Sequence, residues 1–134
     1  MYPKENLRLA QDIVANGGLL LSEYQIGQSC GRYGLVARDR LQAGLAYATI
    51  VIQTGIKGGT MHAVNATIAS RKPLFVVEYR NPVDNSHEKV QGNLMLVREK
   101  GASPLRSTEI DNAVSQIEDS HRANSQSVQP TLFD

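Results

Sequence analysis

The segment GIKGGTMHA, which starts at Gly55, has the residue types of a loop that binds an anion through its backbone. Gly58 and Gly59 carry no side chain that would block an approach to the backbone N–H groups. A helical pattern begins at Thr60, and the free N–H groups of a helix's first turn attract phosphate. Lys57 adds a mobile positive charge. The segment therefore predicts a phosphate site, and a plain turn between a strand and a helix is the alternative.

Two arginines in the segment ARDRL are the candidate side-chain ligands of the same anion. Arg38 and Arg40 flank Asp39 in a predicted helix. Because residues two apart do not share a helical face, we expect one arginine to face a ligand and the other to pair with Asp39 or Glu23. Ser22 and Glu23 end a predicted strand, so we expect them at the same edge as the glycine loop. A solvated helix start with a local ion pair is the alternative.

The sequence predicts no catalytic residue, no metal site and no cofactor. His87 and His121 are isolated in the sequence, without the spacing of metal ligands. His62, in the first turn of a helix, is expected to be a neutral polar neighbour of the phosphate site. Cys30 is the one cysteine of the sequence, which excludes an internal disulfide and fits a reducing compartment. No run reaches membrane-spanning length, so a cytoplasmic location is expected.

The overall charge gives no general attraction for nucleic acid. The 134 residues include 14 Lys and Arg against 13 Asp and Glu, for a formal net charge of +1. Binding of a polyanion would therefore have to rest on a local patch. The length is that of a single domain.

Helical and strand patterns alternate along the chain, which predicts an α/β fold with a mostly parallel sheet covered on both faces. The run YATIVIQT is rich in β-branched residues, so it is predicted to be a central strand that is apolar on both faces. The predicted strands cover residues 19–23, 49–54 and 74–79, and the predicted helices lie within residues 2–18, 35–46, 60–70 and 94–102.

The last part of the chain has a different character. Ile110, Ala113, Val114 and Ile117 recur at helical spacing, so residues 106–123 are predicted to form an amphipathic helix whose one apolar stripe must dock on something. Residues 124–134 are polar and low in complexity, which predicts a flexible, disordered tail.

Several of these segments occur in the order found in a known family. YPKEN, GGLLLSEY, ARDRLQAGLAYATIVIQTGIKGGTMHA, PLFVVEY, GN and GASPL together resemble the DNA-processing protein A (DprA/Smf) family over residues 2–105. The resemblance implies a Rossmann-like three-layer fold that binds single-stranded DNA and helps to load recombinase during the uptake of foreign DNA, and therefore a role in DNA recombination without enzymatic activity.

The resemblance also assigns residues by position. Asp39 stands where the family has Asn in its R-N-R motif. The residues that match the R-N-R arginines, the S-G-S/T loop and the SE pair are Arg38, Arg40, Gly58, Gly59, Thr60, Ser22 and Glu23.

The family's domain begins with strands that precede the YPxxN motif, whereas this sequence begins with Met1, Tyr2 and Pro3. The resemblance therefore implies a partial domain over residues 1–105 with at least one open sheet edge. Because open edges pair readily with other chains, we expect a homodimer or a larger assembly.

Two other functions remain open. Nucleotide phosphoribohydrolases of the LOG type share this architecture and a glycine–threonine loop, but their loop is followed by a catalytic glutamate. Met61 follows Thr60 here, so the alternative is a nucleotide-binding sensor or enzyme of that group. A third possibility is a structural remnant whose amphipathic helix and tail serve partners only.

The tail holds a short motif of its own. Gln129 precedes Leu132 and Phe133 by the spacing of the peptides with which many bacterial DNA-metabolism proteins dock on the sliding clamp. An apolar pair at a disordered end can fill a pocket while the glutamine hydrogen-bonds at its rim. The alternative is a tail that folds back on the apolar stripe between Ile110 and Ile117.

Overall fold

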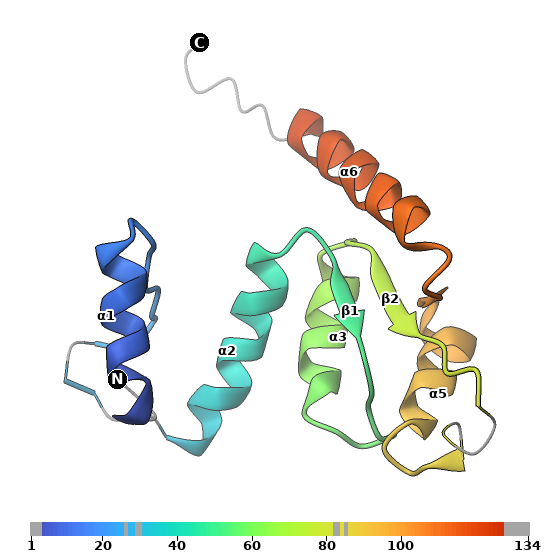
Figure 1. Ribbon diagram of the computed structural model, residues 1–134, viewed down its shortest axis with the longest axis horizontal. Helices are drawn as coiled ribbons and strands as arrows, with labels where there is room; N and C mark the ends of the chain where they lie inside the picture. The colour runs from blue at the N-terminus through green and yellow to red at the C-terminus, as the bar shows by residue number, and fades with distance from the viewer. Residues whose placement is uncertain (1–3, 26, 29–30, 82–83, 85, 128–134) are drawn as a thin grey trace. The chain divides into compact units, whose positions relative to one another are not determined.

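The computed structural model describes residues 4–25, 27–28, 31–81, 84 and 86–127. The chain forms two compact units, Met1–Leu35 and Val36–Asp134. The predicted ranges 1–105, 106–123 and 124–134 stay a prediction. The two units are described separately below, and their elements are labelled in Figure 1.

The first unit contains the helix predicted within residues 2–18. A single 3-10 turn, η1 (Lys4–Asn6), leads into α1 (Leu7–Ala15). The helix ends in a left-handed turn at Gly17, where φ is 79°. The backbone N–H of Gly18 bonds the carbonyl of Ile13 at 2.8 Å across this turn. The helical spacing of the apolar residues was therefore a correct signal, although Ala10 is the only residue of α1 that is buried.

The strand predicted over residues 19–23 is wrong. These residues have no regular secondary structure. Leu19 and Leu21 are also largely exposed, at 81% and 62% of their surface. A strand needs a neighbour for its backbone N–H and C=O groups, and none of the strands in the described parts of the chain pairs with this run. A short apolar run indicates burial but does not by itself distinguish a strand from other structures.

The second unit contains a parallel three-stranded sheet in the order β1-β2-β3. Its register aligns Val51 with Val76 and Val77 with Leu105. This arrangement confirms the predicted α/β class and fits a Rossmann-like fold. Its strands are β1 (Thr49–Val51), β2 (Leu74–Val77) and β3 (Ser103–Leu105). The helices used below are α2 (Arg32–Leu45), which begins in the first unit, α3 (Thr60–Ala69), α5 (Gln91–Lys100) and α6 (Ile110–Ser127).

The core lies on one face of this sheet. α3 packs on β1 and β2, and α5 packs on β2 (Figure 1). Because alternate strand residues share a face, the side chains of one face meet those of both helices. The buried core cluster consists of Val51, Val64, Leu74, Val76, Leu96 and Ala102. On the same side, the hydroxyl groups of Thr49 and Thr67 are 2.6 Å apart and join β1 to α3.

β1 is not the central strand that its composition predicts. It forms an edge of the described sheet, with β2 in the centre. Ile50 points away from the core face and is 47% exposed, so the predicted cover on both faces is incomplete at β1. The third strand, β3, was missed because Ser103 and Pro104 are poor strand residues. A proline is tolerated there because β3 is also an edge strand of the described sheet.

Lys72 fixes the end of α2 against the rest of the second unit. Its ammonium group donates to the carbonyl oxygens of Ala43 at 3.3 Å, Ala46 at 2.7 Å and Gly44. The last carbonyls of a helix have no partner within the helix and carry a partial negative charge. Lys72 therefore satisfies and neutralises the carboxyl end of α2.

α6 is the predicted amphipathic helix, and it continues past residue 123 through Ser127. Its stripe is only partly covered, because Ala113 is buried whereas Ile110 and Val114 are 53% and 47% exposed. His121 stacks on Tyr47 with ring centroids 4.0 Å apart. Residues 128–134, including the predicted docking motif, lie outside the described residues. Within the part that is described, no helix has both the length and the apolar character needed to span a membrane.

Candidate phosphate-binding loop

The glycine loop, residues 55–59, joins the carboxyl end of β1 to the start of α3, as predicted. Gly59 is the N-cap of α3, and Thr60 is its first residue. The first turn is closed by bonds from the N–H of Met61 to the carbonyl of Gly58 at 3.1 Å and from the N–H of His62 to the carbonyl of Gly59 at 3.0 Å. These two bonds leave the earlier N–H groups of the turn for other partners.

Three consecutive backbone donors are open at this point. Among the hydrogen bonds of the described residues, none uses the backbone N–H of Gly58, Gly59 or Thr60. No side chain caps this helix end. An anion that accepts from these groups would also gain from the positive end of the helix dipole.

The glycines at positions 58 and 59 of the loop have different structural explanations. None of them has a positive φ, so backbone conformation does not require them. A Cβ on Gly58 would lie 3.0 Å from the hydroxyl oxygen of Thr54, so close packing accounts for this glycine. A Cβ on Gly59 would have nothing within 4 Å. Neither packing nor backbone conformation among the described residues therefore explains Gly59. A glycine at this position would let a ligand approach the backbone closely.

Asn93, on α5, holds the start of the loop in place. This side chain is 3% exposed. Its Oδ1 accepts from the backbone N–H of Thr54 at 2.9 Å, and its Nδ2 donates to the carbonyls of Ile52 at 2.9 Å and Val77 at 3.1 Å. One buried amide thus joins the chain after β1 to the end of β2.

Gly92 brings α5 against the same segment. Its N–H bonds the carbonyl of Thr54 at 2.9 Å. A Cβ at this position would lie 2.5 Å from the carbonyl oxygens of both Thr54 and Gly55, so no larger residue fits. Sequence reasoning assigned no role to this glycine or to Asn93. The only available signal was the GN pair, a small residue and an amide that precede an apolar helical run.

The three cationic side chains predicted to bind the phosphate lie on different parts of the structure. Lys57 is exposed in the loop, and Arg38 and Arg40 are exposed on α2. Arg40 lies in a groove between α2 and the second half of α3, with Ala66 and Ala69. The glycine loop is at the other end of α3. Arg40 thus lies beside the second half of α3 and not at the loop itself.

Ser22 and Glu23 belong to the first unit, and no strand among its described residues positions them. The hydroxyl of Ser22 accepts from the backbone N–H of Tyr24 at 3.1 Å, which is a local turn. Their predicted place beside the glycine loop stays a prediction.

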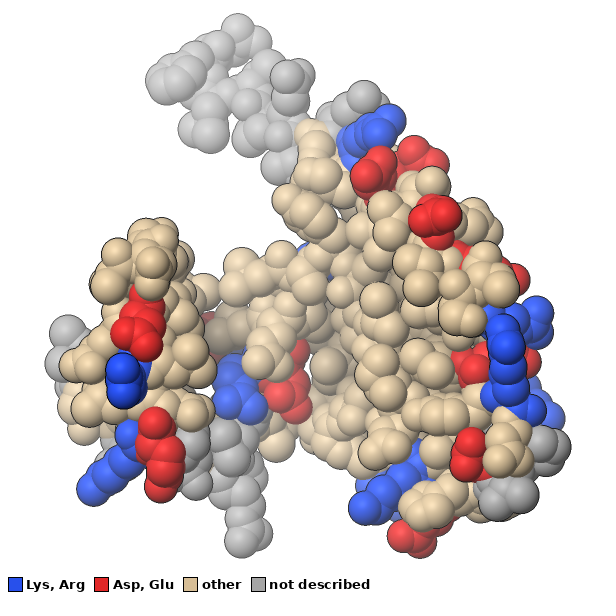
Figure 2. All heavy atoms as spheres, viewed as in Figure 1, with Lys and Arg blue, Asp and Glu red and all other residues tan. Residues whose placement is uncertain are grey.

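Charges of both signs surround the carboxyl edge of the sheet. Glu78 follows β2 and accepts a 2.5 Å bond from Arg106 Nε after β3. This hydrogen bond lowers the pKa of Glu78 below its ordinary value of 4.5. On the face of the second unit drawn in Figure 2, the coloured Lys and Arg side chains lie among Asp and Glu rather than in one continuous basic patch. Nowhere in the described residues do three His, Cys, Asp or Glu side chains gather as a metal site requires.

The comparison with known families decides the assignment of the chain. Residues 1–118 match the family model of DNA recombination-mediator protein A. The chain belongs to this family. The resemblance in the order of the sequence motifs is thereby confirmed.

Individual relatives agree with the family assignment. The chain is 29% identical to Protein Smf of Synechocystis over 115 residues, which cover 78% of this chain and 29% of that protein. It is 33% identical to DNA processing protein DprA of Streptococcus pneumoniae over 76 residues, or 57% of this chain and 27% of that protein. The chain thus spans less than a third of the length of these curated relatives.

Solved structures of the family confirm the Rossmann-like fold. DNA processing protein A of Helicobacter pylori, known for a single-stranded DNA binding mode, matches with a TM-score of 0.68 and 28% identity. The match covers 87% of this chain and 51% of that one. DprA of Streptococcus pneumoniae matches with a TM-score of 0.63 and 27% identity, covering 78% of this chain and 35% of that one.

Proposed function

We propose that this family member binds single-stranded DNA without catalysing a reaction, and that the glycine loop holds a backbone phosphate. Two lines support the proposal. The family is one of DNA recombination mediators, and the Helicobacter pylori relative binds single-stranded DNA. The chain also has open backbone N–H donors beyond the carboxyl end of β1, where ligands of open α/β sheets bind.

The observation that carries the proposal is that three backbone N–H groups without a partner in the described part of the chain lie next to a glycine that packing does not require. The N–H groups of Gly58, Gly59 and Thr60 have no partner among the described residues. The space next to Gly59 is open within 4 Å. A phosphate at this point accepts backbone hydrogen bonds without displacing any bond that the chain already makes.

Side chains extend the site beyond the loop. Gly55 keeps the backbone of the loop bare, Lys57 contributes a point charge, and the hydroxyl of Thr60 is an additional donor. Arg38 and Arg40 on α2 would bind further phosphates of an extended strand, because a guanidinium matches a phosphate in two parallel hydrogen bonds. The ion pair with Arg106 keeps the carboxylate of Glu78 from repelling a phosphate at the same edge.

The test is the binding of a fluorescently labelled single-stranded oligonucleotide, followed by anisotropy at several salt concentrations. Gly59→Leu should lower affinity by about tenfold or more, because loss of backbone bonds to a charged group costs roughly 1.5–3 kcal/mol. Gly31→Leu is the matched control, since a Cβ at Gly31 also has nothing within 4 Å and Gly31 does not line the groove that contains Arg40. It should bind as the wild type does.

Other outcomes separate the alternatives. Equal binding by Gly59→Leu and wild type would show that the glycine loop is not the site. Saturable binding of mononucleotides that Gly59→Leu removes, without binding of oligonucleotides, would favour the LOG-type alternative. A chain that binds neither would be a structural remnant.

We also propose that the tail docks on the sliding clamp through Gln129, Leu132 and Phe133. The proposal rests on the motif and on the family's role in DNA recombination. A peptide of residues 127–134 titrated against purified clamp should bind, and the Leu132→Ala and Phe133→Ala peptides should not. Equal signals from the three peptides would remove the proposal.

A further inference from the structure

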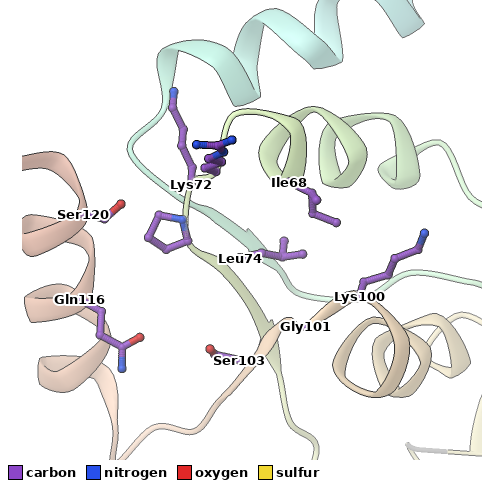
Figure 3. A pocket seen from close by; sticks show the side chains of 10 residues that line it. Ile68, Lys72, Leu74, Lys100, Gly101, Ser103, Gln116 and Ser120 are labelled. Atoms are coloured by element: carbon purple, nitrogen blue, oxygen red, sulfur yellow. The ribbon is translucent and has the colours of Figure 1, made fainter. Parts of the chain in front are cut away.

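A second candidate site lies at the amino ends of β2 and β3, at the opposite end of the strands from the glycine loop. A cavity of about 440 Å³ opens there between α6 and the ends of α3 and α5. In Figure 3, Gln116 and Ser120 of α6 line one side, and Ile68, Leu74 and Ser103 lie across from them. This volume is in the range of small-molecule sites.

The charges around this cavity have one sign. Its lining includes Arg71, Lys72 and Lys100 and contains no Asp or Glu. Lys72 is occupied by the carbonyls of α2. Arg71 and Lys100 have no ion pair or hydrogen bond to another described side chain. In a chain whose charges nearly balance, two unneutralised cations at one cavity favour an anionic ligand.

Arg71 occupies a backbone position that favours glycine. Its φ is 53°, and it is the one residue other than glycine with a positive φ in the described part of the chain. It closes α3: its N–H bonds the carbonyl of Ile68 at 3.0 Å, and the N–H of Lys72 bonds that of Thr67 at 3.1 Å. This is the Schellman arrangement, in which the left-handed residue is usually glycine.

The same chain ends other helices with glycine at this position. α5 ends at Gly101 with φ 70°, and Gly101 lines the same cavity. α1 ends with Gly17 at φ 79°. Helix termination therefore does not require an arginine at position 71. A residue kept in a strained conformation is a reason to look for a function of its side chain.

We propose that this cavity binds a phosphate ester of mononucleotide size. Arg71 and Lys100 would bind the phosphate, and Ser103, Gln116 and Ser120 would hydrogen-bond the polar groups of the ligand. Ile68, Pro73 and Leu74 offer an apolar surface for a planar base. The other explanation of the cations is that they stabilise the carboxyl ends of α3 and α5, where cations are favourable without any ligand.

Calorimetric titration of the full chain with deoxyadenosine monophosphate, and with inorganic phosphate alone, tests the proposal. Arg71→Gly should weaken mononucleotide binding by about tenfold or more, as expected for the loss of a charged hydrogen bond. The same variant should unfold at an equal or higher temperature, because glycine removes the strain. Lys100→Gln should weaken binding as well, and Arg71→Lys should retain part of it.

Gly59→Leu distinguishes the two sites. It should weaken the binding of single-stranded DNA by about tenfold or more and leave the mononucleotide titration unchanged. The proposal is overturned if the wild type takes up no mononucleotide, if Arg71→Gly and Lys100→Gln bind as the wild type does, or if Gly59→Leu removes mononucleotide binding. None of these results depends on whether the glycine loop binds DNA.

Discussion

The side-chain oxygen of Asn93 accepts a hydrogen bond from the backbone N–H of Thr54 at 2.9 Å, across 39 residues of sequence. The bond holds Thr54, which lies between the end of β1 and the start of the glycine loop, in place. Because the amide of Asn93 also donates to Ile52, directly after β1, and to Val77 at the end of β2, the same side chain holds the loop and joins the two strands. The position of the candidate phosphate site therefore depends on a buried residue that would not touch the phosphate.

Asn93→Ala should destabilise the protein by about 2–4 kcal/mol, since it removes the partner of the buried N–H of Thr54 and of the part-buried carbonyl of Val77. The carbonyl of Ile52 keeps a bond from the hydroxyl of Tyr79 at 3.2 Å. Urea unfolding measures the loss. Asn112→Ala, on the exposed side of α6, is the control and should change stability little. A loss below about 0.5 kcal/mol for Asn93→Ala would show that water replaces the amide.

Lys72→Met should loosen the end of α2. The substitution keeps most of the apolar stem but removes an ammonium that donates to three carbonyls, so a loss of roughly 0.5–2 kcal/mol is expected. Amide hydrogen exchange should rise in the last turn of α2 and remain unchanged in α5. Lys89→Met is a matched control on an exposed residue. Equal exchange in the two variants would show that the contacts of Lys72 contribute nothing to α2.

The pKa of Glu78 should depend on Arg106. The hydrogen bond from Arg106 holds this pKa below 4.5. A carboxyl group with a lowered pKa in the folded protein adds stability above its unfolded pKa, and this stability is lost as the pH falls through the folded pKa. In an NMR titration, Arg106→Gln should return the pKa of Glu78 toward 4.5. An unchanged midpoint would mean that the ion pair is not formed in solution.

Much of the fold was readable from local pattern, and the exceptions are non-local. Helical spacing identified α1 and α6, and the β-branched run YATIVIQT identified β1. β3 was not predictable, because Ser103 and Pro104 form a strand only through the neighbouring β2. The three leucines from position 19 illustrate the reverse case, in which a strand-like run lacks a partner strand.

The candidate phosphate site also has a part that the sequence predicts and a part that it does not. The glycine loop was recognisable because glycines, a threonine and a helix start are adjacent in sequence. The support from Asn93 and Gly92 was not, because it arises from segments far apart in the chain. The same holds for the cavity at Arg71, which depends on a backbone angle that no local pattern reveals.

The salt dependence of DNA binding should report on α2. If Arg38 binds a phosphate, Arg38→Ala should reduce the slope of log K against log salt by about 0.7, the value for one contact to a single strand. Arg40→Ala should do the same if the strand continues along the groove between α2 and α3. Arg122→Ala, which removes only an exposed pair with Glu118, is the control and should leave the slope unchanged. Unchanged slopes in the first two variants would exclude α2 from the DNA path.

The edge of the described sheet leads to a prediction about assembly. β1 pairs with β2 alone among the described strands, and Ile50 and Ile52 are 47% and 58% exposed beside this edge. Unpaired strand edges with apolar side chains associate with other chains. We therefore expect a homodimer that covers β1, with a mass by light scattering of twice 14.7 kDa at micromolar concentration. Ile50→Lys should give a folded monomer, whereas Val97→Lys on α5 should leave the dimer intact. A wild-type chain that remains at 14.7 kDa would contradict this assembly.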